Sequence, residues 1–471
     1  MFANINLTLK FNIMKKTKFT IVLVLLLSGL INFLILGQIE NHGIISSSNY
    51  NFTIEVHGDI YNWGTFSNFK TILCGSFNKY LYQYNSSVFE FQQCVVEPDS
   101  VFAKTNLRFN NTQLDFNNKN LTICEGKSVT ITGSSSYLSG ANIWGNNSVL
   151  DMGAGTYITN CNIDDVAING LVSVKSNVVF TTSLVVYGAL YNFPDNHYTC
   201  SVLGDIYNYG TISSNNTNLI LDVEGNIGNS GTWSINSLNL TGNEVQQLSC
   251  DPASSFDNTV INVNKTGGYI DALTGLNFDH CNINVNNDTI FIASGEEINM
   301  QGGYITEAVI IPHTAKAAFE MDMSSGAVIS ASDVHNVTLQ GTTVCGNTTF
   351  TGDIYNNGTL LNYSTNHYTV YIAGNLHNTG NISNNNTNLV MNISGNVVND
   401  GTWTNNSVYL NGGTSQEISC LNGHVFECGL ICVSGTGPVI ALTGLSFSNC
   451  NIDFQNNELQ MPAGSIFSLS G

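Results

Sequence analysis

An eight-residue segment that occurs three times restricts the fold of this chain more than any other feature of its sequence. The segment GDIYNWGT at Gly58–Thr65 returns as GDIYNYGT at Gly204–Thr211 and as GDIYNNGT at Gly352–Thr359. A shorter relative, GNIGNSGTW, begins at Gly225, and another begins at Gly395. A repeat of ~21 residues, the interval from Gly204 to Gly225, corresponds to one turn of a solenoid. Because the Leu frame and helical stretch of leucine-rich repeats are missing, we expect a solenoid built from β-strands.

The residues of the repeated segment explain how such a turn would stack. Side chains alternate across a strand, so Ile206 and Asn208 would point inward while Tyr207 points outward. The inward Asn residues of successive turns would hydrogen-bond to one another as a ladder. We expect Gly210 to turn the chain by adopting a positive φ. The residues expected to continue the buried rows are Ile212, Trp233 and Trp403.

A longer period, of several turns, lies over the short one. The segment at 196–250 matches the segment at 366–420 with a constant offset, and a more degenerate first copy precedes them. We therefore expect a β-solenoid over residues 38–471, made of three long repeats at about 49–187, 188–349 and 350–471. The third repeat is incomplete. We expect either a longer natural chain or a partner that covers the last turn.

Composition supports a β fold and excludes one class of partner. The chain has 13 Lys and Arg against 33 Asp and Glu, which is a net charge of −20. With Arg108 as its single arginine, it cannot form the cationic track that nucleic acid requires, so we expect no nucleic-acid partner. Asn is abundant throughout the chain. Turn residues and β-formers are common, while runs of helix formers are rare, which indicates an all-β fold.

The N-terminus has the pattern of an export signal. Lysines at positions 15, 16 and 18 precede an apolar run over residues 19–36, and Gly37 offers a cleavage site. We expect residues 1–37 to be a signal peptide, with Met14 as an alternative start. An uncleaved anchor is the competing interpretation, because the run approaches the ~20 residues that span a bilayer. The remainder is expected to be secreted or at the cell surface, and not an integral membrane protein unless the N-terminal segment stays uncleaved.

The twelve cysteines leave two interpretations open. Cys161, Cys281 and Cys450 each precede Asn-Ile in strand-like segments, which favours buried thiols. A few disulfides near residues 420–432 are the alternative, because export permits them. No Cys-x-x-Cys pair and no His/Cys cluster with zinc spacing occurs in the sequence. We therefore predict no metal site and no cofactor.

One pair of segments resembles a known group of proteins. The segment LNLTGNEVQQL at residues 238–248 is followed by FDNTVINVN at 256–264, and VYLNGGTSQEI at 408–418 is a later copy. These segments resemble the repeats of large secreted bacterial adhesin-like proteins, many of which use the type IX secretion route. Such proteins are similar to right-handed parallel β-helices. The resemblance implies that fold, with turns of the length found above, and a surface location.

Catalysis is the main competing interpretation, since parallel β-helices also host polysaccharide lyases and hydrolases. Hydrolases need two carboxylates facing a cleft. The adjacent Asp164 and Asp165 resemble the Asp-Asp of polygalacturonases, but the Gly-His-Gly and Arg-x-Lys elements of that family are missing. A lyase needs a basic residue beside acidic groups, and none recurs in that setting. We therefore predict no catalytic residues.

Three tyrosines are the candidate contact residues. Tyr61, Tyr207 and Tyr355 occupy the same outward position of the repeated segment, and an aromatic ring can serve as a platform for a sugar. Because they occur once per long repeat, we expect them to be too far apart to form one patch. The predicted function is a secreted or cell-surface, adhesin-like stalk without catalytic activity, in contact with an extracellular glycan or another cell surface. A β-helix that binds or degrades polysaccharide is the alternative.

Overall fold

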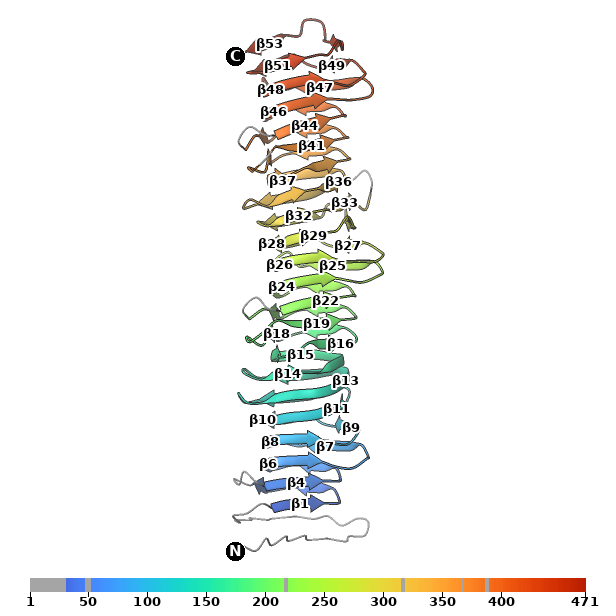
Figure 1. The fold of residues 1–471 in the computed structure, drawn as a ribbon, viewed down its shortest axis with the longest axis vertical. Coiled ribbons are helices and arrows are strands. Elements are labelled where there is room, and N and C mark those ends of the chain that lie inside the picture. Colours follow the sequence, from blue (N-terminus) through green and yellow to red (C-terminus); the bar gives the residue numbers. More distant parts are fainter. Residues whose placement is uncertain (1–30, 47–51, 216–218, 315–317, 366, 386–388) are drawn as a thin grey trace. The chain divides into compact units, whose positions relative to one another are not determined.

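The computed structural model is a β-solenoid in which strands of successive turns pair in parallel (Figure 1). It describes residues 31–46, 52–215, 219–314, 318–365, 367–385 and 389–471. Among these residues there are 53 strands, which make up 61% of them, and no helix. Partner residues on successive turns are about 21 positions apart. The predicted parallel β-helix is confirmed.

The chain divides into two compact units, each a stack of such turns. The first comprises residues 1–225 with 230–236, and the second comprises residues 226–229 with 237–471. The predicted second long repeat, 188–349, therefore contributes residues to both units.

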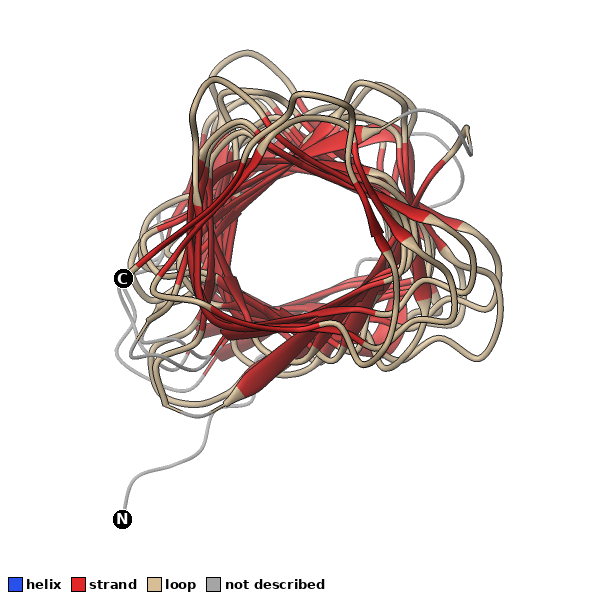
Figure 2. Cartoon of the chain, turned by 90° about the horizontal axis from the view of Figure 1, so that it is seen from above, coloured by secondary structure: helices blue, strands red, loops and turns tan. Residues whose placement is uncertain are grey.

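A typical turn of the first unit contains three strands, which form three walls. β19 (Tyr198–Val202), β20 (Ile206–Asn208) and β21 (Thr211–Ser213) belong to the first, second and third wall respectively. On the third wall, Thr211 pairs with Thr232 of the next turn. Seen along the stack, strands form the walls and the loops project outward from the corners (Figure 2). Outward side chains on a wall therefore form rows, with about 4.8 Å between successive turns.

The interior follows the predicted alternation. In β20, Ile206 and Asn208 are fully buried, whereas Tyr207 is 39% exposed. Burial of such apolar rows is the main stabilising contribution to the stack. The predicted core residues Ile212, Trp233 and Trp403 are all buried.

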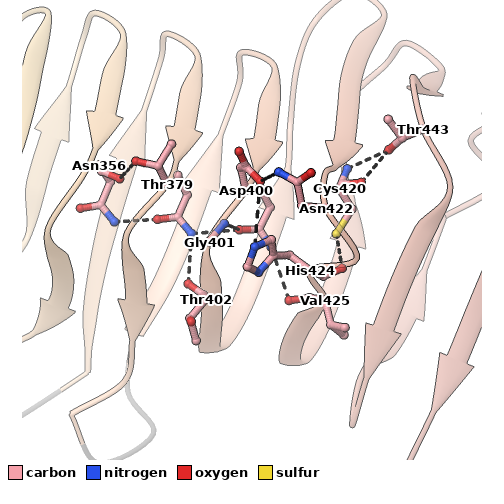
Figure 3. A network of polar contacts seen from close by, with 12 residues as sticks. Asn356, Thr379, Asp400, Gly401, Thr402, Cys420, Asn422, His424, Val425 and Thr443 are labelled. Carbon is pink, nitrogen blue, oxygen red and sulfur yellow. Dashed lines mark hydrogen bonds and ion pairs between the residues drawn. The ribbon is translucent and has the colours of Figure 1, made fainter.

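Buried asparagines that close short strands form the predicted ladder. In the second unit they close β39 (Ile354–Asn356), β42 (Leu376–Asn378) and β45 (Val397–Asn399). Asn356 donates to Asn378 Oδ1 at 2.7 Å, and Asn378 donates to Asn399 Oδ1 at 2.9 Å. In the first unit, Asn41 donates to Asn62 at 2.8 Å. Figure 3 shows the ladder starting from Asn356 and, beyond it, the outer contacts of Asp400 with Asn422 and His424.

The prediction for Gly210 is wrong, because this residue does not adopt a positive φ. Its role is close approach between turns: a Cβ on Gly210 would lie 2.1 Å from the carbonyl oxygen of Gly188. Gly380 of the second unit meets the oxygen of Gly358 at the same distance. Positive φ is supplied elsewhere, by 15 other glycines and by 12 asparagines among the described residues; Asn tolerates the left-handed region better than most residues. Among the described non-glycine residues with positive φ, the majority are Asn.

The predicted signal peptide lies only partly within the described residues. Residues 1–30, including Met14, fall outside them. Residues 31–35 form β1 (Ile31–Ile35), which pairs with β4 (Phe52–Val56) on the third wall. Cleavage after Gly37 would therefore remove β1 from that wall.

The cysteines are free thiols, and all but two of them are buried. The exceptions are Cys124 and Cys450, which are partly exposed. Near the alternative disulfide region, Cys428 Sγ lies 3.4 Å from Cys450 Sγ without a bond between them. The buried-thiol interpretation is the one that the structure supports.

Candidate functional site

Tyr61 belongs to an outward row of stacked rings on the first wall. It lies in β5 (Ile60–Asn62), between two buried residues. The register places it opposite Tyr82 of β7 (Lys79–Gln83). Their ring centroids are 4.3 Å apart and the ring planes differ by 5°. Parallel-strand register, with one side chain above another on successive turns, explains this stacking.

A second row lies beside the first. Trp63 stacks on His42 of the preceding turn at 4.3 Å and on Tyr84 of the following turn at 4.4 Å. Within a turn, Tyr61 and Trp63 are 6.2 Å apart, and Tyr82 and Tyr84 are 6.4 Å apart. We call these five residues the aromatic block. It has two adjacent rows of rings that span three successive turns.

The stacking determines which parts of the aromatic block can contact a ligand. Ring faces cover one another along the stack, so the ring edges and polar groups point outward, and the Tyr and Trp side chains are half-buried. Burial, followed by Tyr82 and Asp59, raises the pKa of Tyr61 to about 12. Its phenol therefore remains a neutral hydrogen-bond donor at physiological pH. Each stacked pair contributes about 0.5–1.5 kcal/mol, so the block also stabilises its turns.

Tyr207 occupies the corresponding position of the second repeat, within the first unit. Its hydroxyl donates to Asp205 at 3.0 Å, and this hydrogen bond is the largest cause of the raised pKa of Tyr207. In the neighbouring row, Tyr187 stacks on Tyr209 at 5.5 Å with ring planes 13° apart. Both of these rings are more than half exposed. Only the second row thus recurs here as a stacked pair, because Tyr207 lies opposite Val185 of the preceding turn.

Tyr355, in the second unit, is 44% exposed and lines a shallow groove of ≈ 220 Å³. Its ring lies 6.0 Å from that of His377 on the next turn. A polar row forms the other side of the groove. In this row, the backbone N–H of each residue donates to the side chain of the residue one turn before it: Asn375 to Asp353, Asn396 to Asn375, and Glu417 to Asn396, all at 2.8 Å.

The carboxylates lie in two different settings. Asp165 has a φ of 51°, and its N–H donates to Thr182, which places the Asp164–Asp165 pair at a bend of β15 (Asn162–Val174). Glu297 instead faces Glu320 on the next turn. Burial, followed by Asp322 and Glu320, raises the pKa of Glu297. The proximity of these last three residues was not predicted from the sequence, because it depends on the stacking register.

The structure surrounds each of the three predicted tyrosines with groups that were not predicted. Trp63, Tyr82 and Tyr84 were missed, although a signal was present: Tyr-x-Trp at 61–63 and Tyr-x-Tyr at 82–84 are aromatic pairs one turn length apart. An outward pair repeated at the turn length predicts two stacked rows. Stacking of residues repeated at the turn length was predicted for inward positions, but not for these outward pairs.

Comparisons with known proteins do not assign the chain to a family. No family model, curated protein or solved structure matches it. In the described part of the chain, no helix is long and apolar enough to cross a membrane.

Proposed function

We propose that this protein is a non-catalytic, adhesin-like solenoid of the cell exterior that contacts a neutral polysaccharide through the first wall. The observation that carries the proposal is the aromatic block, in which outward rings and a tryptophan gather on one face. Aromatic side chains with polar tips are suited to surfaces that are partly apolar and partly hydrated, such as that of a sugar. The export pattern at residues 1–37 supports the extracellular location.

The charges around the rings favour an uncharged ligand. Asp59, Asp205 and Asp353 each lie two residues before a predicted contact tyrosine. Their carboxylates can accept hydrogen bonds from sugar hydroxyls but would repel uronates or sulfated sugars. The net charge of −20 acts in the same direction.

A binding experiment with paired variants tests this function. The purified protein would be applied to arrays of neutral and acidic glycans, and to whole cells, alongside the double variant Trp63→Ala/Tyr82→Ala. We expect wild-type binding to neutral glycans and its loss in the variant. Tyr137→Ala/Tyr157→Ala is the matched control, because it removes a pair stacked at 5.2 Å on the third wall and leaves the aromatic block intact. Blank arrays and cells for the wild type, or equal binding by both variants, would refute the proposal.

Glu297 and Glu320 favour polysaccharide cleavage as a second candidate function. Side chains on successive turns are about 4.8 Å apart, close to the ~5–5.5 Å between the carboxyl groups of retaining glycosidases. A raised pKa is the property required of the acid. However, Asp322, the third carboxylate, packs against Gly341, as Asp151 packs against Gly170 at the equivalent position of the first repeat.

This repetition indicates a structural role for Asp322. Release of reducing sugar ends by the wild type, but not by Glu320→Gln, would establish the catalytic alternative. No release from a panel of neutral polysaccharides would exclude it for those substrates.

A further inference from the structure

One corner of the first unit stacks three potential metal ligands directly above one another. β4, β6 (Thr65–Leu73) and β8 (Val88–Val96) pair so that Val56 lies opposite Leu73, and Leu73 opposite Val96. The next residues along the chain are His57, Cys74 and Glu97. Their order is held by backbone hydrogen bonds from Cys74 to Val56 at 2.8 Å and from Glu97 to Leu73 at 3.0 Å. An imidazole, a thiol and a carboxylate therefore project from one corner on successive turns.

A fourth group approaches from the adjacent outward row. Glu55 lies two residues before His57, and ligand atoms of Glu55, His57 and Cys74 are all within 4.8 Å of one another. The Glu97 carboxylate lies close enough to the Cys74 thiol to influence its protonation, although it is outside the group of atoms within 4.8 Å of one another. The corner thus brings together one nitrogen, one sulfur and two carboxylate ligands.

The protonation of Cys74 argues against nucleophilic catalysis at this corner. The residue is only 5% exposed. Burial, then Glu97 and Glu55, raises the pKa of its thiol to about 12. A catalytic cysteine needs a lowered pKa, since the thiolate is the nucleophile. By contrast, a metal ion can bind the deprotonated sulfur even where the free thiol would keep its proton.

The charges around the corner match a divalent cation. The two carboxylates and a metal-bound thiolate would carry a charge of −3. Lys79, which is 3% exposed, supplies +1. Its Nζ lies 3.7 Å from the position that a Cβ on Gly75 would occupy, and His57 Nδ1 lies 3.5 Å from the same position. The remaining charge of −2 is what one divalent ion neutralises.

The ligand set occurs in the first repeat alone, unlike the structural ladders. The same corner of the third repeat carries Thr351, Ala373 and Ser394, which occupy successive turns. In the second repeat, the residues that replace His57 and Cys74 are Leu203 and Glu224. A structural position would recur with the repeat, whereas a binding site is needed only once.

We propose that Glu55, His57, Cys74 and Glu97 form a zinc site that joins three successive turns of the first unit. Zinc binds this mixture of sulfur, nitrogen and carboxylate oxygen, whereas Ca²⁺ and Mg²⁺ prefer oxygen alone. Tetrahedral zinc places its ligand atoms about 3.3–3.8 Å apart. Zinc binding would draw the ligand atoms of Glu55, His57 and Cys74, now within 4.8 Å of one another, to these distances. The metal would act as a cross-link near the start of the solenoid.

Metal titration of the full chain, purified with its thiols reduced, tests this site. We expect one Zn²⁺ per chain by calorimetry and a higher thermal unfolding temperature with zinc present. Substitution by Co²⁺ should produce a thiolate-to-cobalt charge-transfer band. His57→Gln and Cys74→Ser should abolish stoichiometric binding. His42→Gln is the matched control. His42 also lies near a glutamate, Glu40, at 3.9 Å, but it is on a neighbouring turn and outside the corner. This variant should bind zinc as the wild type does.

An additional variant keeps the test decisive if the buried substitutions impair folding. Glu97 is exposed, so Glu97→Gln should fold normally and weaken zinc binding at least by the ~10–100-fold that loss of a supporting ligand partner costs. The absence of stoichiometric zinc in the reduced wild type would overturn the proposal. A Co²⁺ complex without the thiolate-to-cobalt charge-transfer band would also overturn it. So would unchanged zinc affinity in the single variant Glu97→Gln and in either His57→Gln or Cys74→Ser.

Discussion

Replacing Asn378 by alanine should destabilise the second unit strongly, because this side chain is the middle member of the buried asparagine ladder. It is fully buried and takes part in three hydrogen bonds. It accepts from Asn356 at 2.7 Å, donates to Asn399 at 2.9 Å, and donates to the carbonyl of Thr402 at 3.0 Å. At a net ~1 kcal/mol each, their loss would cost about 3 kcal/mol. Partners left unsatisfied in the interior would increase that cost.

The measurement should separate local from global loss. Solenoid stability is approximately a sum over turns and their interfaces, so denaturant unfolding followed by circular dichroism should be combined with amide hydrogen exchange. We expect a lower unfolding midpoint, with exchange accelerated most in β39, β42 and β45. Asn357→Ala is the control, because Asn357 is exposed and accepts a hydrogen bond from Thr379 at 2.8 Å; it should cost less than about 0.5 kcal/mol. Equal effects of the two substitutions would refute the claim that the ladder stabilises the stack.

Three further substitutions or treatments have defined outcomes. Gly210→Ala should lower the thermal unfolding temperature sharply, because its Cβ would lie 2.1 Å from a backbone oxygen. Gly43→Ala is the control and should be tolerated, because no atom lies within 4 Å of a Cβ at that position. Equal effects of the two substitutions would contradict the close-approach argument. Oxidised glutathione should convert Cys428 and Cys450 into a disulfide, with glutathione taking up the two electrons and two protons, and peptide mass spectrometry would detect the link. The pKa of Glu297 is raised in the folded state, so ionisation of this carboxyl at neutral pH disfavours folding. Glu297→Gln should therefore stabilise the protein at neutral pH relative to wild type. In paired denaturation curves the difference should vanish near pH ~4, where the carboxyl is protonated.

Inward positions were the most predictable part of this protein. The alternation in Ile206-Tyr207-Asn208 predicted two buried residues around an outward one, and the ladder followed from repetition of the same asparagine at the turn length. Trp233 and Trp403 were predicted as core residues because each restarts an apolar row after the glycine of the repeated segment. Such positions are predictable because each depends on its own strand and on a translation by one turn.

Gly210 shows where local propensity misled the prediction. Glycine permits a positive φ, but it also permits backbones to approach without a Cβ, and the second property is used here. The difference depends on a neighbouring turn, at the oxygen of Gly188. The sequence of one turn contains no sign of that contact.

The sequence by itself determined the repeat length, the parallel strands and the inward rows, because those follow from periodicity and the alternation of side chains. The tertiary structure decided which outward residues meet. The interval from His57 to Cys74 is shorter than the interval from Cys74 to Glu97, and both are too long for a local metal motif to reveal them. Turns of unequal length bring these residues into one column only once the register is known. The physical reason is that an outward side chain's neighbours belong to other turns, whose loops set the register between strands.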